Sequence, residues 1–346
     1  MTIPSIGGND SFGDKIKINH HMNIEQPSSD NKKVAIDDEN EYSVQKFKED
    51  YNNIFHSQVF PIIVEYDEER KKRLAFAVIL SVIFILLGII LFFAIEERGA
   101  GDAAAFCVAA AVGSWALIKK SFEKKVKRKI MPLLMNAFKG FYWQETPPVS
   151  HEELCKINIF PKIKNAARSF DDSFVGSYRN VSLNLSECSY ETGGKHSVII
   201  FRGCVVKLKM NKNFEGATII RPKYVGLGDS SDLKKLNMQL VKLEDIEFDN
   251  EYEVYSTDQI EARYLITTSF MERFKNISMA FSSSGTFCAF YGDSVYIAPY
   301  STEDLFDLFR LTKPVTDTTQ FSVLFDEFVS ILELVDHFKL DKKLGL

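Results

Sequence analysis

The chain has 346 residues, of which 45% are hydrophobic and 26% charged, and its net charge is −5 at neutral pH. The last 196 residues carry a net charge of −5, which argues against nucleic-acid binding, because that function needs a basic folded domain. The five cysteines show no paired spacing, which argues against a disulfide-bonded scaffold and suits a reducing compartment.

Residues 1–40 contain few large apolar side chains, so we expect a disordered N-terminal tail. No apolar region follows a basic start before residue 74, so we expect no secretory signal peptide. His20 and His21 are adjacent, but the sequence offers them no further ligands, and we predict no metal site and no cofactor.

Residues 41–73 are predicted to form an amphipathic helix that enters the membrane. Apolar side chains recur at intervals of three and four residues from Phe47 to Tyr66. Pro61 lies within this pattern. Because proline cannot donate a backbone hydrogen bond, it should kink or interrupt the helix.

The segment from Leu74 to Ile95 has 22 residues and no charged side chain. As a helix it is about 33 Å long, which is enough to cross a bilayer core of about 30 Å. We therefore predict a transmembrane helix over residues 74–95. The alternative is a buried helix of a soluble protein.

A second apolar segment covers residues 103–118, and we predict a second transmembrane helix there. The polar residues 96–102 connect the two segments, which indicates a helical hairpin with a short extracytoplasmic loop. The second segment is rich in small residues, which allow helix backbones to approach closely in lipid. The expected helix-contact positions are Ala103, Ala105, Ala109, Ala110 and Gly113.

Basic residues flank both apolar segments on their outer sides. Because positive residues beside a membrane span stay in the cytoplasm, we predict that both termini are cytoplasmic. Residues 70–150 carry a net charge of +8, so we also expect attraction to anionic membrane lipids. The simpler alternative is that these residues only set the topology. The membrane-flanking basic residues are Arg70, Lys71, Lys72, Arg73, Lys119, Lys120, Lys124, Lys125, Lys127, Arg128 and Lys129.

Residues 119–148 repeat the helical spacing of apolar side chains, and we predict a basic amphipathic helix there. Pro61 lies 13 residues before Leu74, and Pro132 lies 14 residues after Ile118. In an antiparallel pair the two prolines would lie at the same level, which indicates a continuous helical stalk. The alternative is two independent surface helices.

Residues 149–346 are predicted to form a cytoplasmic α+β domain, mostly an antiparallel sheet with a long C-terminal helix, behind the two-span transmembrane helical hairpin. Alternating patterns indicate strands over residues 181–190 and 198–210. Gly292 and Asp293 have the form of a two-residue hairpin turn.

An apolar stripe predicts a long helix over residues 318–340 that packs on the sheet, with Asp317 as its cap. Residues 163–170 are also expected to be helical. Ser256 and Ser269 each precede a Gln or Glu by three residues, which is the pattern of a capping box. We expect each of them to open a short helix.

The order of segments and several motifs over residues 45–340 resemble a family of bacterial membrane proteins, domain of unknown function 3137. The most specific motif runs from Val254 to Tyr264, with supporting matches at residues 213–216 and 243–248. The resemblance implies a cytoplasmic α+β domain behind a two-span hairpin in the bacterial inner membrane. It implies no activity, substrate or catalytic residue.

The candidate ligand or partner residues in this motif are Asp258, Glu261, Arg263 and Tyr264. Glu261 and Arg263 are two positions apart and fall on different faces of a helix, so they make a poor acid–base pair. We favour a structural role, in which Asp258 supports the helix start while Ile260 and Tyr264 face the core. Partner binding is the alternative, and we predict no catalytic residue.

The sequence therefore predicts a membrane-tethered binding or scaffolding module, whose partner is a protein or a second copy of the chain. The alternative is a membrane-associated enzyme or small-ligand sensor, which a pocket lined by residues with shifted pKa values would support. A transport role is disfavoured, because neither apolar segment contains an ionisable residue.

Overall fold

The computed structural model describes residues 44–94, 99–138, 140–178, 181–194, 197–210, 213–223, 231–302, 305–306, 310–314 and 319–342. The predictions for the tail over residues 1–40, for His20 and His21, and for a cap at Asp317 lie outside these residues.

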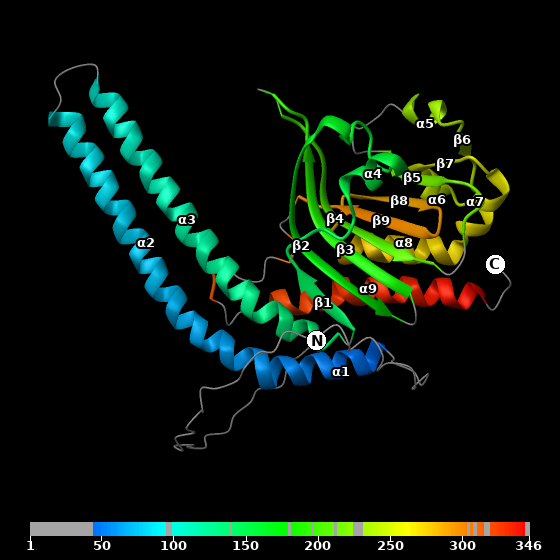
Figure 1. Ribbon diagram of the computed structural model, residues 1–346, viewed down its shortest axis with the longest axis horizontal. Coiled ribbons are helices and arrows are strands. Elements are labelled where there is room, and N and C mark those ends of the chain that lie inside the picture. Colours follow the sequence, from blue (N-terminus) through cyan, green and yellow to red (C-terminus); the bar gives the residue numbers. More distant parts are fainter. Residues whose placement is uncertain are drawn as a thin grey trace. The chain divides into compact units, whose positions relative to one another are not determined.

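A pair of long antiparallel helices forms the N-terminal part of the described chain (Figure 1). Helix α1 covers Val44–Ile54 and continues through a π-helical segment, Phe55–Val59, into helix α2, Phe60–Ala94. Helix α3 covers Gly99–Met135. Two long apolar helices are therefore present, as predicted.

The π-helical segment explains how the helix tolerates Pro61. The proline ring would clash with the carbonyl group four residues earlier, that of Ser57, and it offers no N–H to bond it. The backbone N–H of Phe60 instead donates to the carbonyl of Phe55, five residues earlier, which widens the turn. The predicted interruption at Pro61 is thus a local change of helix type within a continuous helix.

Contacts between α2 and α3 define the register of the hairpin. Lys125 Nζ lies 2.7 Å from Glu69 Oε2, and the Arg73 guanidinium lies 5.9 Å from the centre of the Phe122 ring. Further along, a Cβ on Gly88 would lie 3.1 Å from Cys107 Cβ. Continued toward the base of the hairpin, the same register brings Pro61 to the level of Pro132, which supports a continuous stalk.

The small residues that face α2 agree only in part with those predicted, because Ala103 and Ala110 are half-buried whereas the other three positions are not. Gly88 packs against Ala104 and Cys107, and Cys107 and Ala111 are buried between the helices. Ala105, Ala109 and Gly113 are instead exposed. The prediction rests on residue type alone. The contact face is instead set by how the two helices cross, and this places residues 104, 107 and 111 against α2.

One nine-stranded antiparallel sheet forms the rest of the fold. Its order is β1-β2-β3-β4-β9-β8-β5-β7-β6. The strands are β1 Phe141–Gln144, β2 Ala167–Tyr178, β3 Val181–Glu191, β4 Ile199–Lys209, β5 Thr218–Pro222, β6 Gln239–Val241, β7 Tyr252–Ser256, β8 Gly285–Tyr291 and β9 Ser294–Tyr300. The predicted strands over 181–190 and 198–210 and the turn at Gly292–Asp293 are confirmed.

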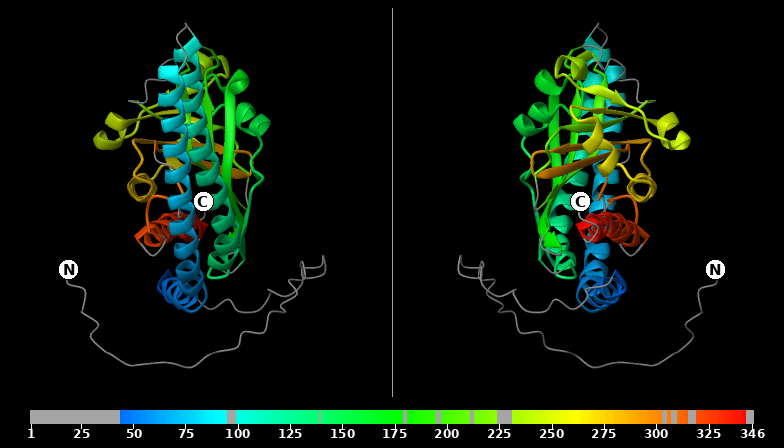
Figure 2. Two further views of the ribbon diagram at one scale, coloured as in Figure 1. Left: turned by 90° about the vertical axis from the view of Figure 1, so that its left-hand side faces the viewer. Right: turned by 90° about the vertical axis from the view of Figure 1, so that its right-hand side faces the viewer.

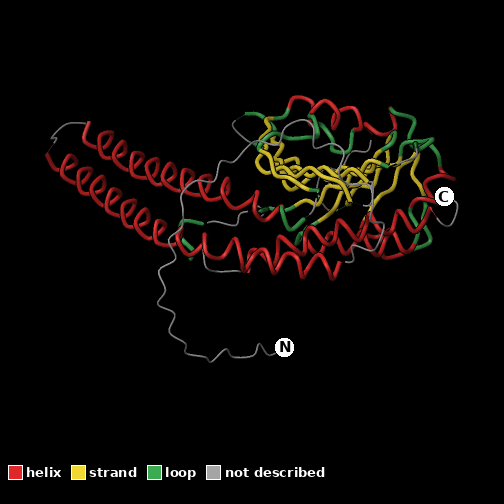
Figure 3. Tube along the Cα trace, turned by 60° about the horizontal axis from the view of Figure 1, so that its bottom comes forward, coloured by secondary structure: helices red, strands yellow, loops and turns green. Residues whose placement is uncertain are grey.

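Helices cover both faces of the sheet unequally (Figure 3). One face packs on α1, the lower part of α3, α8 (Thr268–Ala280) and α9 (Thr319–Lys342), and together they form the larger hydrophobic core. The other face packs on α4 (His151–Ile157) in a smaller core. The remaining short helices are the 3₁₀ turn Ile163–Asn165, α5 Ser231–Lys235, α6 Ile246–Glu251 and α7 Gln259–Leu265.

Three predicted boundaries are wrong. Helix α3 ends at Met135 instead of continuing to residue 148, and Gly140, at φ +87°, allows the turn into strand β1. Residues 167–170 are a strand and not a helix, because they pair with β3. The helix expected from Ser269 starts at Thr268.

Candidate functional site

A buried ion pair joins the hairpin to the sheet. Lys127 Nζ on α3 lies 2.5 Å from Asp172 Oδ2 on β2, and Trp143 Nε1 on β1 donates to Asp172 Oδ1 at 2.7 Å. Asp172 is completely buried. We refer to Lys127, Asp172 and Trp143 as the hairpin junction.

A β-bulge directs Asp172 to this place. The register of β2 with β3 shifts between Phe170 and Ser173. In a regular strand Phe170, Asp172 and Phe174 would share one face. Phe170 instead packs in the smaller core, whereas Phe174 lies in the larger core on the helix side. The extra residue of the bulge thus brings Asp172 to α3.

The electrostatics of the junction are shaped by burial. Burial raises the pKa of Asp172 to about 6, although the charge of Lys127 opposes this shift. Burial also opposes the charge of Lys127, but the carboxylates of Asp172, Asp171 and Glu187 hold its pKa above the usual value. One ammonium group therefore lies among three carboxyl groups.

Those three carboxyl groups have the spacing of a metal site. Oxygen atoms of Asp171, Asp172 and Glu187 all lie within 4.8 Å of one another. The ammonium group of Lys127 lies against Asp172 and supplies positive charge at the same place. The arrangement therefore acts as an internal salt bridge between helix and sheet.

The segment before α9 also contacts the hairpin. Arg70 Nη1 on α2 donates to the carbonyl of Leu311 at 3.2 Å, and the Leu311 N–H donates to Glu123 Oε1 on α3 at 3.3 Å. The Leu305 N–H donates to Glu187 Oε1 on β3 at 3.0 Å. The base of the hairpin is thus attached to the domain at several points.

Most of the predicted membrane-flanking basic residues pair with carboxylates of the protein itself. The pairs are Arg70 and Lys71 with Asp67, Lys71 with Glu68, Arg73 and Lys125 with Glu69, Lys119 with Glu123, Lys124 and Arg128 with Glu145, and Lys127 with Asp172. Within the described part of the chain, Lys72, Lys120 and Lys129 form no ion pair. The net positive charge available to lipid is therefore smaller than the sequence alone indicates.

The cysteines lack the features of activated nucleophiles. Cys188, Cys204 and Cys288 are buried, and burial raises the pKa of each thiol. Cys155 Sγ lies 3.5 Å from His151 Nε2, but burial raises its pKa too, against the opposing charges of nearby basic residues. These thiols are protonated at neutral pH.

Two of the predicted site residues hold the backbone in place. Asp258 caps α7, because its Oδ1 accepts from the backbone N–H groups of Ile260 at 2.8 Å and Glu261 at 2.9 Å. The predicted support of the helix start by Asp258 is confirmed. Ser256, predicted to open this helix, lies in β7, and its hydroxyl accepts from the Asp258 N–H at 3.0 Å.

Glu261 joins the most specific motif, residues 254–264, to the supporting match at residues 213–216. Its carboxylate accepts from the backbone N–H groups of Glu215 at 2.9 Å and Gly216 at 2.7 Å. A Cβ on Gly216 would lie 2.9 Å from Thr257 Oγ1, so this close approach requires glycine. Residues 213–216 and 254–264 therefore form one packed unit.

The prediction that Ile260 and Tyr264 face the core is wrong. Ile260 is 69% exposed and Tyr264 is 60% exposed, one turn apart on α7. Arg263 is also exposed and donates to the carbonyl of Gln259 on its own helix at 2.9 Å. Helix α7 is seven residues long and buries Ala262, so its apolar outer positions remain in solvent.

Sequence reasoning missed the hairpin junction. The sequence predicts a membrane-flanking role for Lys127, and no motif or periodicity in it marks Asp172. The available signal is the pair Asp171–Asp172, two adjacent acids between the large apolar residues Phe170 and Phe174. Two adjacent acids there indicate a bulge or a buried partner.

Comparisons with known proteins bear on the C-terminal part. The family model described as "Protein of unknown function (DUF3137)" matches residues 199–340. No curated protein matches the chain. The crystal structure of the mycobacterial trehalose monomycolate transport factor A, TtfA, is 13% identical, covers 56% of this chain and 86% of that chain, and has a TM-score of 0.29. A TM-score of this size does not establish a shared fold.

The family match includes β4 to β9 and most of α9, and it contains the joined motifs around Gly216 and Asp258. The resemblance inferred from the motif at Val254–Tyr264 is thereby confirmed: residues 199–340 match the family of proteins of unknown function DUF3137.

Proposed function

We propose that this chain is an integral membrane protein whose hairpin crosses the bilayer and holds the sheet domain at the membrane surface as a binding or scaffolding module. Two helices are long and apolar enough to cross a membrane by length and composition. Only 11% of each apolar window is buried, whereas a core helix of a soluble protein would be mostly buried. This exposure is the observation that carries the proposal.

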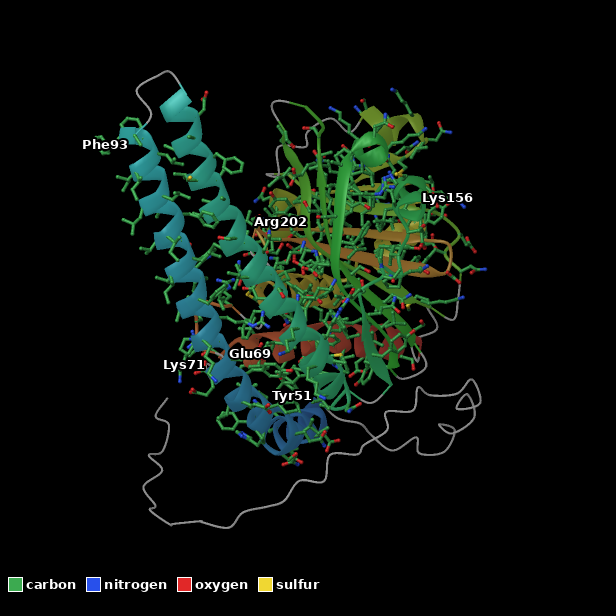
Figure 4. The ribbon with its side chains drawn as sticks, turned by 60° about the vertical axis from the view of Figure 1, so that its left-hand side comes forward. Tyr51, Glu69, Lys71, Phe93, Lys156 and Arg202 are labelled. Carbon is green, nitrogen blue, oxygen red and sulfur yellow. The ribbon has the colours of Figure 1, made fainter. Side chains whose placement is uncertain are left out.

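The exposed side chains of the hairpin are large and apolar. Phe93, Phe106 and Leu117 are each more than 70% exposed, and Figure 4 shows Phe93 pointing away from the helix pair. A continuous apolar surface of this kind is unfavourable in water and favourable in lipid. The proposed orientation places both termini in the cytoplasm of a bacterial cell, at the inner membrane, because the basic flanks lie on that side.

The domain is mounted rigidly in this proposal. Helices α2 and α3 continue without a break from the apolar region to the ion pairs at the base of the hairpin. The surface of the domain therefore keeps a constant orientation to the membrane. That property suits a scaffold, which presents a surface in a defined place.

The partner surface that we propose is the outer face of α7. Ile260 and Tyr264 do not contribute to the core, whereas Asp258 and Glu261 fix the helix that presents them. Exposed aromatic side chains on a rigid element are common anchors of protein interfaces. We propose a protein partner that covers Tyr264 and Ile260 with an apolar segment of its own.

A photo-crosslinking amino acid at Tyr264 in the full-length protein tests this function. We expect a discrete crosslinked protein band in cells, and no such band from the same probe at Met279, which is as exposed but lies on α8. Tyr264→Ser should weaken capture of the same band by a probe at Ile260. Identical products from positions 264 and 279 would contradict a specific surface.

An enzyme or small-ligand sensor is the second candidate. The observation in its favour is that two acids are buried in different elements, where burial raises the pKa of Asp172 on β2 to about 6 and that of Glu327 on α9 to about 8. A thermal-shift screen of the detergent-solubilised protein with metabolites tests it. A stabilising compound whose effect is lost in Glu327→Gln would favour this candidate over the scaffold.

A further inference from the structure

The connection between β3 and β4 exposes two apolar side chains at one end of the sheet. Val198 is 60% exposed and Ile199 is 39% exposed. Thr192 and Val198 close the ends of this connection, because the Thr192 N–H donates to the Val198 carbonyl at 2.9 Å and the Val198 N–H donates to Thr192 Oγ1 at 2.8 Å. The two apolar residues are thus held at the tip of a long strand pair.

Measured along each element, this tip lies about as far from the junction as the start of the apolar part of the hairpin. From the junction at Lys127, α3 rises about 14 Å to Ile118 at about 1.5 Å per residue. From Glu187, beside the junction, β3 rises about 13 Å to Glu191 at about 3.3 Å per residue, and Val198 lies one residue beyond. Figures 1 and 2 show α3, β3 and β4 running in the same general direction from the junction.

Exposed basic residues lie at the same end of the sheet. Lys162, Lys164 and Arg168 precede or begin β2, whose first residue Ala167 pairs with Glu191. Within the described residues none of these three side chains forms an ion pair. Among the acids of this end, Glu191 accepts a hydrogen bond from Ser197 Oγ at 3.2 Å. Three basic side chains and the Glu191 carboxylate therefore lie at this end, beside the two apolar side chains at its tip.

Apolar side chains flanked by unpaired basic residues are typical of surfaces that bind the head-group region of anionic membranes. We propose that the β3–β4 tip, through Val198 and Ile199, enters the head-group region of the same bilayer that the hairpin crosses, with Lys162, Lys164 and Arg168 against anionic lipid. The sheet domain then contacts the membrane at a second place, which fixes its tilt. This inference rests on the proposed membrane insertion of the hairpin.

The test uses an environment-sensitive fluorophore on single cysteines of the full-length protein in nanodiscs of phosphatidylcholine and phosphatidylglycerol. The background carries Cys155→Ser, because Cys155 is partly exposed, and Cys107→Ala, because Cys107 lies in the apolar part of the hairpin that also carries the label at 93. The other three cysteines are buried in the sheet domain. Labels replace Val198, Phe93 on the hairpin, and Ile246, an exposed apolar residue on α6. We expect blue-shifted emission and reduced iodide quenching at positions 93 and 198, and a water-exposed label at 246.

The outcomes separate the inference from the proposed function. A lipid-exposed label at 93 with a water-exposed label at 198 overturns membrane contact by the tip and leaves the hairpin in place. Water-exposed labels at both positions overturn both proposals. With Lys162, Lys164 and Arg168 changed to Gln, or with phosphatidylcholine alone, the label at 198 should shift toward the aqueous spectrum. An unchanged spectrum at 198 in both conditions overturns the assignment to anionic lipid.

Discussion

The ammonium group of Lys127 lies in the interior, between helix α3 and strand β2. It pairs there with Asp172, which the bulge of β2 directs toward α3. A buried ion pair contributes little net stability, because both groups lose their water. Loss of one partner is nevertheless costly, because it leaves the other charge buried alone. The junction is therefore the place where a single substitution should reveal how firmly the hairpin is attached.

Lys127→Met should destabilise the protein in a pH-dependent way. The pKa of Asp172 is already raised to about 6 by burial, and it should rise further without the nearby ammonium group. An acid whose pKa is raised in the folded state favours folding while it is protonated. That contribution to the free energy of unfolding is lost as the pH rises through the folded-state pKa. We expect a loss of about 3–5 kcal/mol at pH above the folded pKa and a much smaller loss near pH 5, by chemical denaturation in detergent.

Two controls accompany this variant. Lys129→Met removes an exposed lysine of the same helix that forms no ion pair within the described chain, and its effect should be small at every pH. Lys127→Met combined with Asp172→Asn should recover much of the stability. Equal losses from Lys127→Met at acidic and alkaline pH would contradict the buried pair.

Gly203→Ala should also destabilise the fold. Gly203 has φ +145°, and a Cβ there would lie 2.1 Å from the backbone oxygen of Pro299 on the neighbouring strand. Both the conformation and the contact exclude a side chain, so we expect a loss of at least about 1 kcal/mol in denaturation experiments. Gly193→Ala is the control, because nothing lies within 4 Å of its added Cβ. Similar stability of the two variants would argue against this geometry.

At the scale of elements, the helix pair and the sheet meet through α3, which belongs to both. Its register with α2 is set by Glu69 with Lys125 and by Gly88 with Cys107. The same register brings Pro61 and Pro132 to one level near the base. The pairing of α2 with α3 near the two prolines can therefore be tested by crosslinking.

Cysteines placed at positions 61 and 132, in the background without Cys107 and Cys155, should form a crosslink with a short bifunctional reagent. Band shifts on denaturing gels provide the measurement. Cysteines at 61 and 119 are the control, because residue 119 lies about 20 Å, or about 3.6 helical turns, from residue 132 along α3. If a cysteine at position 61 forms no crosslink with a cysteine at position 132 or at the positions next to 132, the helices do not pair at the base.

The sequence was informative where a local pattern determines structure. The strand over 181–190, the turn at Gly292–Asp293 and the two long apolar helices follow from period, turn chemistry and length. Predictions failed where the local structure depends on a contact with a segment elsewhere in the sequence. Residues 167–170 form a strand because β3 pairs with them, and this pairing has no local signal.

The candidate site shows the same division. The capping role of Asp258 follows from its place before a helix, and it is confirmed. The outward position of Ile260 and Tyr264 depends on how a short helix sits at the edge of the domain. The pairing of Lys127 with Asp172 joins residues 45 positions apart, and no periodicity in either segment predicts it.

At the scale of the whole described chain, an apolar hairpin and a sheet domain share one hydrophobic core at the base of the helices. That core, the junction and the Arg70 contact with Leu311 give the domain little freedom to swing. A binding module built in this way would present its surface at a constant place relative to the membrane.

Membrane insertion with the sheet domain in the cytoplasm is tested most directly by labelling single cysteines in intact bacterial cells with a membrane-impermeant maleimide. Gly99→Cys, at the far end of the hairpin, should be labelled in intact cells. Met279→Cys, exposed on α8, should be labelled only after lysis. Labelling of Met279→Cys in intact cells, or protection of Gly99→Cys until lysis, would contradict a hairpin that crosses the membrane with the domain inside.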